Sequence, residues 1–182
     1  IISQNESFNV VWSNSNKLIN SMKIVNSNGE EVLSKSLTST NELSNVRISN
    51  NLASGLYFVV FNTGFAIYDK SGNLLAGPLS PNPTIFPSSG CCDLTASYDA
   101  AADRWVITFL GGGAQVAVSD GPDPINDGWY NYNIGAINDY QKLSVWSDGY
   151  YMTDNTGSSN KVWAMERAEM LMGNTAQILG FN

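Results

Sequence analysis

The sequence contains no histidine at any of its 182 positions and only two cysteines. Without histidine there is no Ser-His-Asp triad, no His-ligated metal site and none of the commonest general base. Aspartates are numerous, but nothing in their spacing selects the two carboxylates at about 5–10 Å that glycoside hydrolysis requires. We therefore predict no catalytic residue and no enzymatic activity.

Positive charge and long apolar runs are also scarce. Nine Lys and Arg against sixteen Asp and Glu give a formal net charge of −7 and a pI near 4.3. A nucleic-acid partner is not expected, because such a partner needs a basic surface. No apolar run approaches the roughly 20 residues of a membrane-spanning helix, so no membrane span is predicted.

The composition changes near residue 63. Residues 1–63 are neutral and contain no Asp, Pro or Cys, whereas residues 64–182 hold ten Asp and carry the whole net charge. We therefore predict two domains, residues 1–62 and residues 63–182.

The first domain contains several short strand patterns. Residues 22–33 form two apolar runs around Asn28-Gly29, a dipeptide that favours a tight hairpin. Apolar side chains at every second position, Leu56, Phe58 and Val60, predict a half-buried strand. A small antiparallel sandwich follows from this pattern.

Residues 5–60 resemble the type A C-terminal sorting domain of the type IX secretion system of Gram-negative bacteria. The resemblance rests on the Asn-Gly hairpin together with the run Leu52-Ala-Ser-Gly-Leu-Tyr-Phe-Val59. It implies an Ig-like sandwich that binds the outer-membrane translocon, a shuttle barrel and a sortase. The residues expected to contact this machinery, by an exposed edge or by face packing, are Asn28, Gly29, Leu52, Gly55, Leu56, Tyr57, Phe58 and Val59.

The second domain reads as short strands separated by Gly, Asp, Asn and Pro, which is typical of an all-β sandwich, barrel or propeller. A turn or two of helix is expected only over residues 166–172. The predicted strands are residues 65–69, 104–110, 116–119, 143–146, 150–153 and 162–165.

Residues 61–182 are similar to the opening blades of large secreted bacterial β-propeller proteins. The similarity rests on segments such as Tyr98-Asp99-x-x-x-Asp103-Arg104-Trp105 and Asp148-Gly149-Tyr150-Tyr151. It implies a partial propeller, incomplete and cut from a longer chain, whose few blades leave an apolar face uncovered.

The order of the two domains is unusual, because a sorting signal of this kind belongs at the extreme C-terminus and here it opens the chain. The hypothesis is a natural protein that runs from signal peptide through propeller to sorting domain, with the present chain joining fragments in the other order. An engineered fusion is the alternative.

Asp120, Asp123 and Asp127 precede Trp129 in a turn-rich stretch. Clustered carboxylates suit a hard cation, so calcium is the candidate ion. The favoured interpretation is a turn within a blade, in which the aspartates accept backbone N–H bonds.

Cys91 and Cys92 are adjacent. In an exported protein two cysteines usually form disulfides. We expect oxidation, with Cys92 bonded to a residue outside the present sequence as the favoured outcome and the bond between the two neighbours as the less favoured one.

Aromatic residues of the second domain suit core packing, but some could stack on sugar rings. Trp129, Tyr150 and Tyr151 are the candidate ligand surface, and one ring of the Tyr-Tyr pair is expected to be exposed.

Together these features predict a non-enzymatic cargo of type IX secretion, exported through the periplasm and outer membrane to the cell surface or the medium. The alternative is a surface adhesin or glycan-binding propeller with an Ig-like spacer, and a glycosidase comes third.

Overall fold

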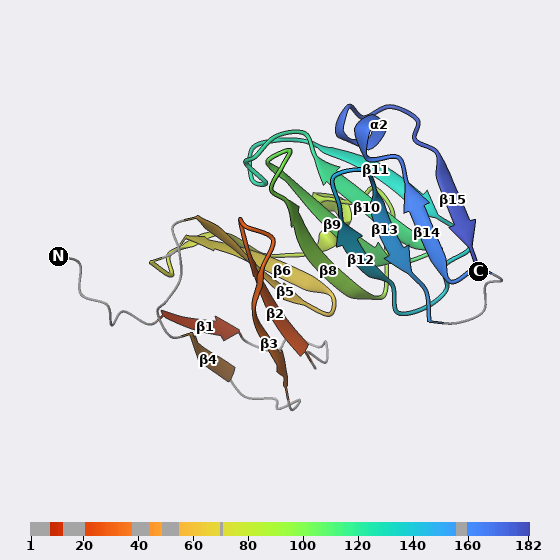
Figure 1. Cartoon of the computed structure of the whole chain (residues 1–182). Coiled ribbons are helices and arrows are strands. Elements are labelled where there is room, and N and C mark those ends of the chain that lie inside the picture. Colours follow the sequence, from red (N-terminus) through yellow and green to blue (C-terminus); the bar gives the residue numbers. More distant parts are fainter. Residues whose placement is uncertain (1–7, 13–20, 38–43, 49–54, 70, 156–159) are drawn as a thin grey trace.

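The computed structural model describes residues 8–12, 21–37, 44–48, 55–69, 71–155 and 160–182, and for 8–12 and 44–48 the backbone alone. This part of the chain is all-β, as the sequence predicts, and every strand pairing in it is antiparallel. Figure 1 shows three larger sheets in succession along the molecule, with the C-terminus on the last of them. A separate two-stranded sheet pairs β1 (Phe8–Trp12) with β4 (Ser44–Ile48).

The first large sheet has five strands in the order β3-β2-β5-β6-β7. The hairpin predicted at Asn28-Gly29 is confirmed, because Gly29 takes the left-handed conformation (φ +78°) between β2 and β3. The strands are β2 (Ser21–Asn26), β3 (Glu31–Ser36), β5 (Leu56–Phe61), β6 (Gly64–Asp69) and β7 (Leu74–Leu79).

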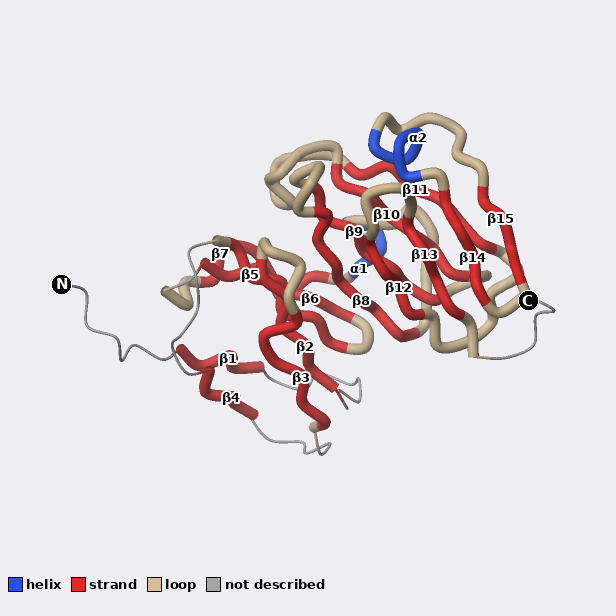
Figure 2. The backbone as a smooth tube through the Cα atoms, viewed as in Figure 1, coloured by secondary structure: helices blue, strands red, loops and turns tan. Residues whose placement is uncertain are grey.

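Two four-stranded sheets follow, and each is a simple up-and-down meander (Figure 2). The first consists of β8 (Cys92–Asp99), β9 (Arg104–Leu110), β10 (Ala114–Ser119) and β11 (Trp129–Ile134). The second consists of β12 (Lys142–Val145), β13 (Tyr150–Thr153), β14 (Val162–Met165) and β15 (Ile178–Phe181). The helices are short, α1 (Pro81–Thr84) and α2 (Arg167–Leu171), and α2 lies within the range predicted to be helical.

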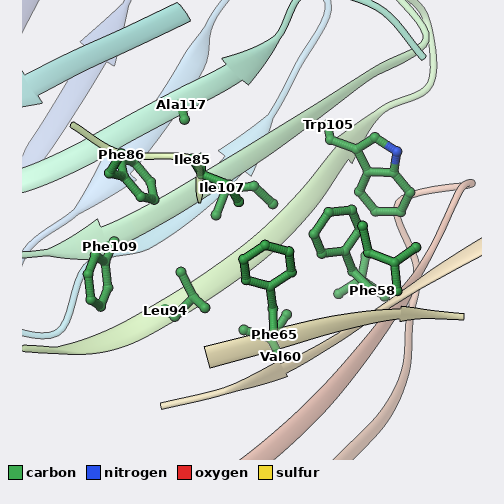
Figure 3. Close-up of a cluster of buried hydrophobic side chains, with 12 residues drawn as sticks. Phe58, Val60, Phe65, Ile85, Phe86, Leu94, Trp105, Ile107, Phe109 and Ala117 are labelled. Atoms are coloured by element: carbon green, nitrogen blue, oxygen red, sulfur yellow. The ribbon is translucent and has the colours of Figure 1, made fainter. Parts of the chain in front are cut away.

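The three sheets are held together by two cores. One lies between the five-stranded sheet and β8–β11, where Phe58 packs on Trp105 with ring centroids 4.5 Å apart and on Phe65 at 5.6 Å (Figure 3). The other lies between the two meanders and contains Val116, Met152 and neighbouring apolar side chains. Apolar burial of this kind contributes roughly 25 cal/mol per Å², so these two layers are the main source of stability.

The opposite face of the five-stranded sheet has a third apolar cluster, which contains Met22, Ile24, Tyr57 and Val59. Strand β5 is therefore covered on both faces, with Phe58 and Val60 in one core and Tyr57 and Val59 in another. The prediction that β5 is half-buried is wrong, because it lies in the centre of a sheet that has apolar layers on both sides.

Residues 62 and 63 lie in the turn of the β5–β6 hairpin, where Phe61 pairs with Gly64. The predicted boundary between the two domains coincides with this turn, and the sheet continues across it. Among the described residues no helix is both long and apolar enough to cross a membrane.

Candidate functional site

The turn of the β2–β3 hairpin is built around the buried side chain of Asn26. Its Oδ1 accepts hydrogen bonds from the backbone N–H of Asn28 and of Glu30, each at 2.9 Å, and its Nδ2 donates to Glu30 Oε2 at 2.9 Å. The backbone N–H of Gly29 donates to the Asn26 carbonyl at 3.0 Å. These bonds fix the turn, so the exposed Asn28 and Gly29 are presented in one conformation.

The tip of this hairpin rests on the neighbouring meander. A Cβ added to Gly29 would lie 2.8 Å from the carbonyl oxygen of Tyr98 in β8. No side chain fits at that separation, so glycine is required both for its positive φ and for the close approach. The hairpin is thus positioned by the β8–β11 meander as well as by its own sheet.

Strand β3 is the outer strand of the five-stranded sheet, because within the described chain it pairs only with β2. Most of its side chains are exposed, and Lys23 on β2 forms a 2.6 Å ion pair with Glu31 at its start. An edge strand presents unpaired backbone N–H and C=O groups, which can add a strand from another chain. This hairpin edge, Asn28 to Ser36, is the candidate functional site.

The predicted contact residues on β5 are in a different environment. Tyr57, Phe58 and Val59 are at most 1% exposed, and β5 pairs with β2 on one side and β6 on the other. These three side chains cannot touch a partner of the folded chain, and their assignment as contact residues is corrected on this ground.

The other predicted contacts flank that buried segment. Gly55 and Leu56 are half-buried, and a Cβ at Gly55 would collide with the side chain of Ser27. Leu52 lies outside the described residues. Asn28 and Gly29 alone among the predicted contacts are exposed in the described part of the chain.

A buried charged cluster joins the two meanders. Arg167 at the start of α2 donates to both carboxylate oxygens of Asp99, at 2.5 and 3.0 Å, and Tyr150 donates its hydroxyl to Asp99 at 2.8 Å. The Asp99 side chain is 2% exposed and that of Arg167 15%. The cluster ties the end of β8 to β13 and α2.

Burial acts to raise the pKa of Asp99, but the hydrogen bonds from Arg167 and Tyr150 and the guanidinium charge hold it below its usual range. The pKa of Tyr150 is raised strongly, first by burial and then by its bond to the Asp99 carboxylate. Asp99 and Tyr150 are thus hydrogen-bonded to each other, and Asp99 also to Arg167, within this internal contact.

The aspartates between β10 and β11 form a turn. Asp123 accepts hydrogen bonds from the backbone N–H of Ile125 and Asn126 and from the Asn126 side chain, which lower the pKa of Asp123. Asp127 accepts from the Asp123 N–H at 2.8 Å, and Asp120 accepts from the Tyr130 hydroxyl at 2.5 Å.

Each of the three carboxylates in this turn accepts hydrogen bonds from its own protein donors. Among the residues that the structure describes, no group of three or more acidic, Cys or His side chains is arranged to hold a metal ion. The calcium site predicted from Asp120, Asp123 and Asp127 is corrected accordingly, and the geometry matches the turn that the sequence argument favoured.

Cys91 and Cys92 are bonded to each other in the structure. This is the outcome that the sequence argument favoured less. Cys91 is exposed, while Cys92 begins β8 and packs partly against the core between the meanders.

The candidate aromatic surface is not a continuous one. Tyr150 is fully buried, so it cannot contact a ligand, and Trp129 packs partly against the core beside the five-stranded sheet. Tyr151 is half-buried and donates its hydroxyl to Asp148 at 2.9 Å, so the prediction that one ring of the Tyr-Tyr pair is exposed is met only in part.

The exposed indole in this region belongs to Trp146, which the sequence argument did not select as a contact residue. Trp146 is 63% exposed at the β12–β13 turn and lines a groove of about 570 Å³ between that turn, the β8–β9 turn and the tip of the β2–β3 hairpin. Its position directly before Ser147-Asp148-Gly149, a turn sequence, is the signal that could have found it.

Part of the chain matches a known protein family. Residues 4–74 match the family described as the secretion system C-terminal sorting domain. The matched stretch contains β1 to β6 and ends at the first residue of β7, so the sorting domain includes the β2–β3 hairpin and its exposed edge. No curated protein and no solved structure matches the chain.

The sorting domain indicates a cargo protein of the type IX secretion system. Such a domain marks proteins that are exported through the outer membrane to the cell surface or secreted. The chain accordingly carries an export signal within its first 74 residues, and its interaction with the secretion machinery follows from that signal.

Proposed function

We propose that the secretion machinery recognises the sorting domain through the edge of β3 and the Asn28-Gly29 turn. The observation that carries this proposal is the position of β3 at the edge of the sheet with most of its side chains exposed. Strand addition to such an edge gives affinity through main-chain hydrogen bonds. By the resemblance, the partners are the outer-membrane translocon, its shuttle barrel and a sortase.

The buried residues of β5 have a supporting role in this proposal. Tyr57 and Phe58 anchor the strand in two apolar layers, and β5 holds β2 in register, from Met22 opposite Phe61 to Asn26 opposite Tyr57. The run that resembles the sorting family therefore shapes the sheet whose edge is recognised.

Site-specific photo-crosslinking in secreting cells tests this proposal. A photoreactive amino acid at Ser36, on the exposed edge strand, should cross-link to a component of the outer-membrane machinery. The matched control is the same amino acid at Ile125, which is exposed between β10 and β11. Equal cross-linking at the two positions would refute recognition through the β3 edge. Accumulation of the chain in the medium of cells without a working translocon would contradict export by the type IX route.

We further propose that β8–β11 and β12–β15 are adjacent blades of a propeller-type passenger. What supports this is the repeat of two four-stranded meanders packed face to face, the arrangement of successive blades. The outer face of β12–β15 carries Val162, Leu179 and Phe181, each more than a third exposed, which a further stacked sheet would cover. Electron microscopy of the exported protein should show such sheets around a central axis, and a linear stack would contradict the proposal.

The groove beside Trp146 favours a second candidate function, binding of a surface glycan. The described residues that line it combine the exposed indole with the hydroxyl groups of Ser97, Ser144 and Ser147 and include Asp99 but no Lys or Arg. A flat apolar ring beside hydrogen-bonding groups is the combination that suits a neutral pyranose.

Titration with neutral hexaose chains, followed by tryptophan fluorescence, tests this candidate. Trp146→Ala should abolish any saturable response, whereas Phe181→Ala, which removes a ring that is 51% exposed on another face, should leave it intact. A response that survives Trp146→Ala would exclude this groove as the glycan site.

A further inference from the structure

The tip of the β2–β3 hairpin contains the single Asn-Gly pair of the sequence, Asn28-Gly29. An asparagine followed by glycine is open to attack from within the chain, because the glycine has no Cβ to shield its nitrogen and its backbone turns freely. Both residues are exposed. The pair is therefore a candidate for covalent modification that needs only water.

The reaction available to this pair is deamidation. The backbone nitrogen of Gly29 bonds to Cγ of Asn28, the Cγ–Nδ2 bond breaks, and ammonia leaves with the proton of the Gly29 nitrogen. Water then opens the resulting succinimide ring. Cleavage between the Gly29 nitrogen and Cγ gives aspartate, and cleavage between that nitrogen and the main-chain carbonyl carbon of Asn28 gives isoaspartate.

In the folded hairpin the attacking nitrogen is held in another bond. The N–H of Gly29 donates to the Asn26 carbonyl at 3.0 Å, and the N–H of Asn26 donates to the Glu30 carbonyl at 3.1 Å, which closes the turn. Attack requires the Gly29 nitrogen to lose its proton and to face Cγ of Asn28. The turn must therefore open before the reaction can begin.

The side chain of Asn26 holds this turn closed. Its Oδ1 accepts from the backbone N–H groups of Asn28 and Glu30, on the two sides of the reactive pair, each at 2.9 Å. Its Nδ2 donates to Glu30 Oε2 at 2.9 Å. Asn26 is 5% exposed, so water competes little for these bonds, and a buried hydrogen bond is stronger than an exposed one.

We propose that Asn28 is a deamidation site that the folded hairpin protects, and that Asn26 is the residue that maintains the protection. The reaction proceeds in chains whose β2–β3 turn is open and is suppressed in chains whose turn is closed. The proposal depends on this turn alone, and it stands whether or not β3 is the edge recognised by the secretion machinery.

Isoaspartate at position 28 would disturb the contact between the hairpin and β8. It inserts an extra carbon into the main chain directly before Gly29. A Cβ on Gly29 would already lie 2.8 Å from the Tyr98 carbonyl oxygen, so the tip has no room for a longer backbone. The modified tip should therefore detach from the β8–β11 meander.

Incubation of the full chain at mildly alkaline pH, folded in buffer and unfolded in urea, tests the proposal. Mass spectrometry of the tryptic peptide 24–35 measures the change of amide to acid at Asn28, and an isoaspartate-specific methyltransferase with its methyl donor counts the isoaspartate. The folded chain should react at least about tenfold more slowly than the unfolded one, because only the open fraction of turns reacts. Equal rates in the two states would overturn the proposal.

Asn26→Ala should raise the rate in the folded chain about tenfold, because it removes the side-chain hydrogen bonds that close the turn. Asn26→Asp combined with Glu30→Gln keeps an acceptor at position 26 and a donor opposite it, so it should restore the slow rate. The matched control Thr108→Val removes the hydrogen bond to Thr95 within the β8–β9 pairing and should leave the rate at Asn28 unchanged.

A rise in Thr108→Val as large as that in Asn26→Ala would overturn the proposal, because the rate would then report unfolding of the whole chain. The comparison of the folded and unfolded wild-type chain decides without any variant. The isoaspartyl chain, once refolded, should have a lower urea midpoint than the unmodified chain. An equal midpoint would overturn the expected loss of the contact with β8.

Discussion

Arg167→Met should strongly destabilise the protein, because it leaves the Asp99 carboxylate buried without its cation. The guanidinium supplies two of the hydrogen bonds to Asp99, at 2.5 and 3.0 Å, and the remaining side-chain donor is the Tyr150 hydroxyl at 2.8 Å. Removal of one partner of a buried ion pair typically costs about 3–5 kcal/mol. The 15% exposure of the Arg167 side chain lets water reach the site, so we expect a value near the lower end of that range.

The pH dependence of the stability lost in Arg167→Met follows from the direction in which the pKa of Asp99 is shifted. The pKa of Asp99 is lowered in the folded chain, so the pair contributes stability above the unfolded value of about 3.9 and loses it as the pH falls through the folded pKa. In Arg167→Met no cation offsets the burial of Asp99, so the pKa of Asp99 should rise, and its protonation then removes the unpaired buried charge. The difference in the free energy of unfolding between the wild-type protein and Arg167→Met should therefore narrow from pH 7 to pH 3.

Urea unfolding followed by tryptophan fluorescence measures these differences. Tyr150→Phe is the control, because it removes a single hydrogen bond and should cost only about 1 kcal/mol. The double variant Asp99→Asn with Arg167→Met should be more stable than Arg167→Met alone, since no unpaired charge remains. A loss below about 1 kcal/mol at pH 7, or one that does not change with pH, would refute this reasoning.

Three further outcomes are expected. Gly29→Ala should destabilise the chain by more than about 1 kcal/mol, because residue 29 has a positive φ and a Cβ there would lie 2.8 Å from the Tyr98 carbonyl oxygen. The urea midpoint measures this loss, and an unchanged midpoint would contradict the contact. Trp105→Ala should cost about 3–5 kcal/mol by opening a cavity in a fully buried site, measured in the same way, and a loss below about 1.5 kcal/mol would show that the core is not packed as described. Cys91 and Cys92 should take up no maleimide until a dithiol reductant is added and then two equivalents per chain by mass spectrometry; labelling before reduction would exclude the bond.

Local signals were sufficient to predict several elements. Asn28-Gly29 identified the first hairpin because few other dipeptides adopt positive φ so readily. Residues 104–110, 150–153 and 162–165 were predicted with the bounds that the structure has, since Gly and Asp turns delimit them. Strands β7, β8, β11 and β15 were missed. The sequences of β7 and β15 carry no clear apolar alternation, whereas Leu94, Ala96 and Tyr98 in β8, and the tyrosines and isoleucine of β11, do alternate and could have been found.

The environment of β5 could not be obtained from alternation alone. The run Leu56-Tyr-Phe-Val-Val-Phe61 is apolar at every position, which is the pattern of a strand covered on both faces. Which layers cover it depends on partners far away in the sequence, Trp105 among them.

The buried cluster of Asp99, Tyr150 and Arg167 could not be predicted either, because its members are far apart in the sequence. Asp99 and Arg167 are 68 positions apart, and no motif links them. Tyr150 was therefore assigned to a ligand surface, whereas the cluster draws it inside the molecule.

The turn at Asn62 and Thr63 has a consequence for proteolysis. A cut at this turn would break one peptide bond but none of the pairing between β5 and β6, and it would leave Phe58 and Phe65 stacked in the same core. The two pieces should therefore remain bound as a complementing pair, separable by denaturant and not by gel filtration. Release of a passenger from its signal at this point would require unfolding of the shared sheet as well as cleavage of the chain.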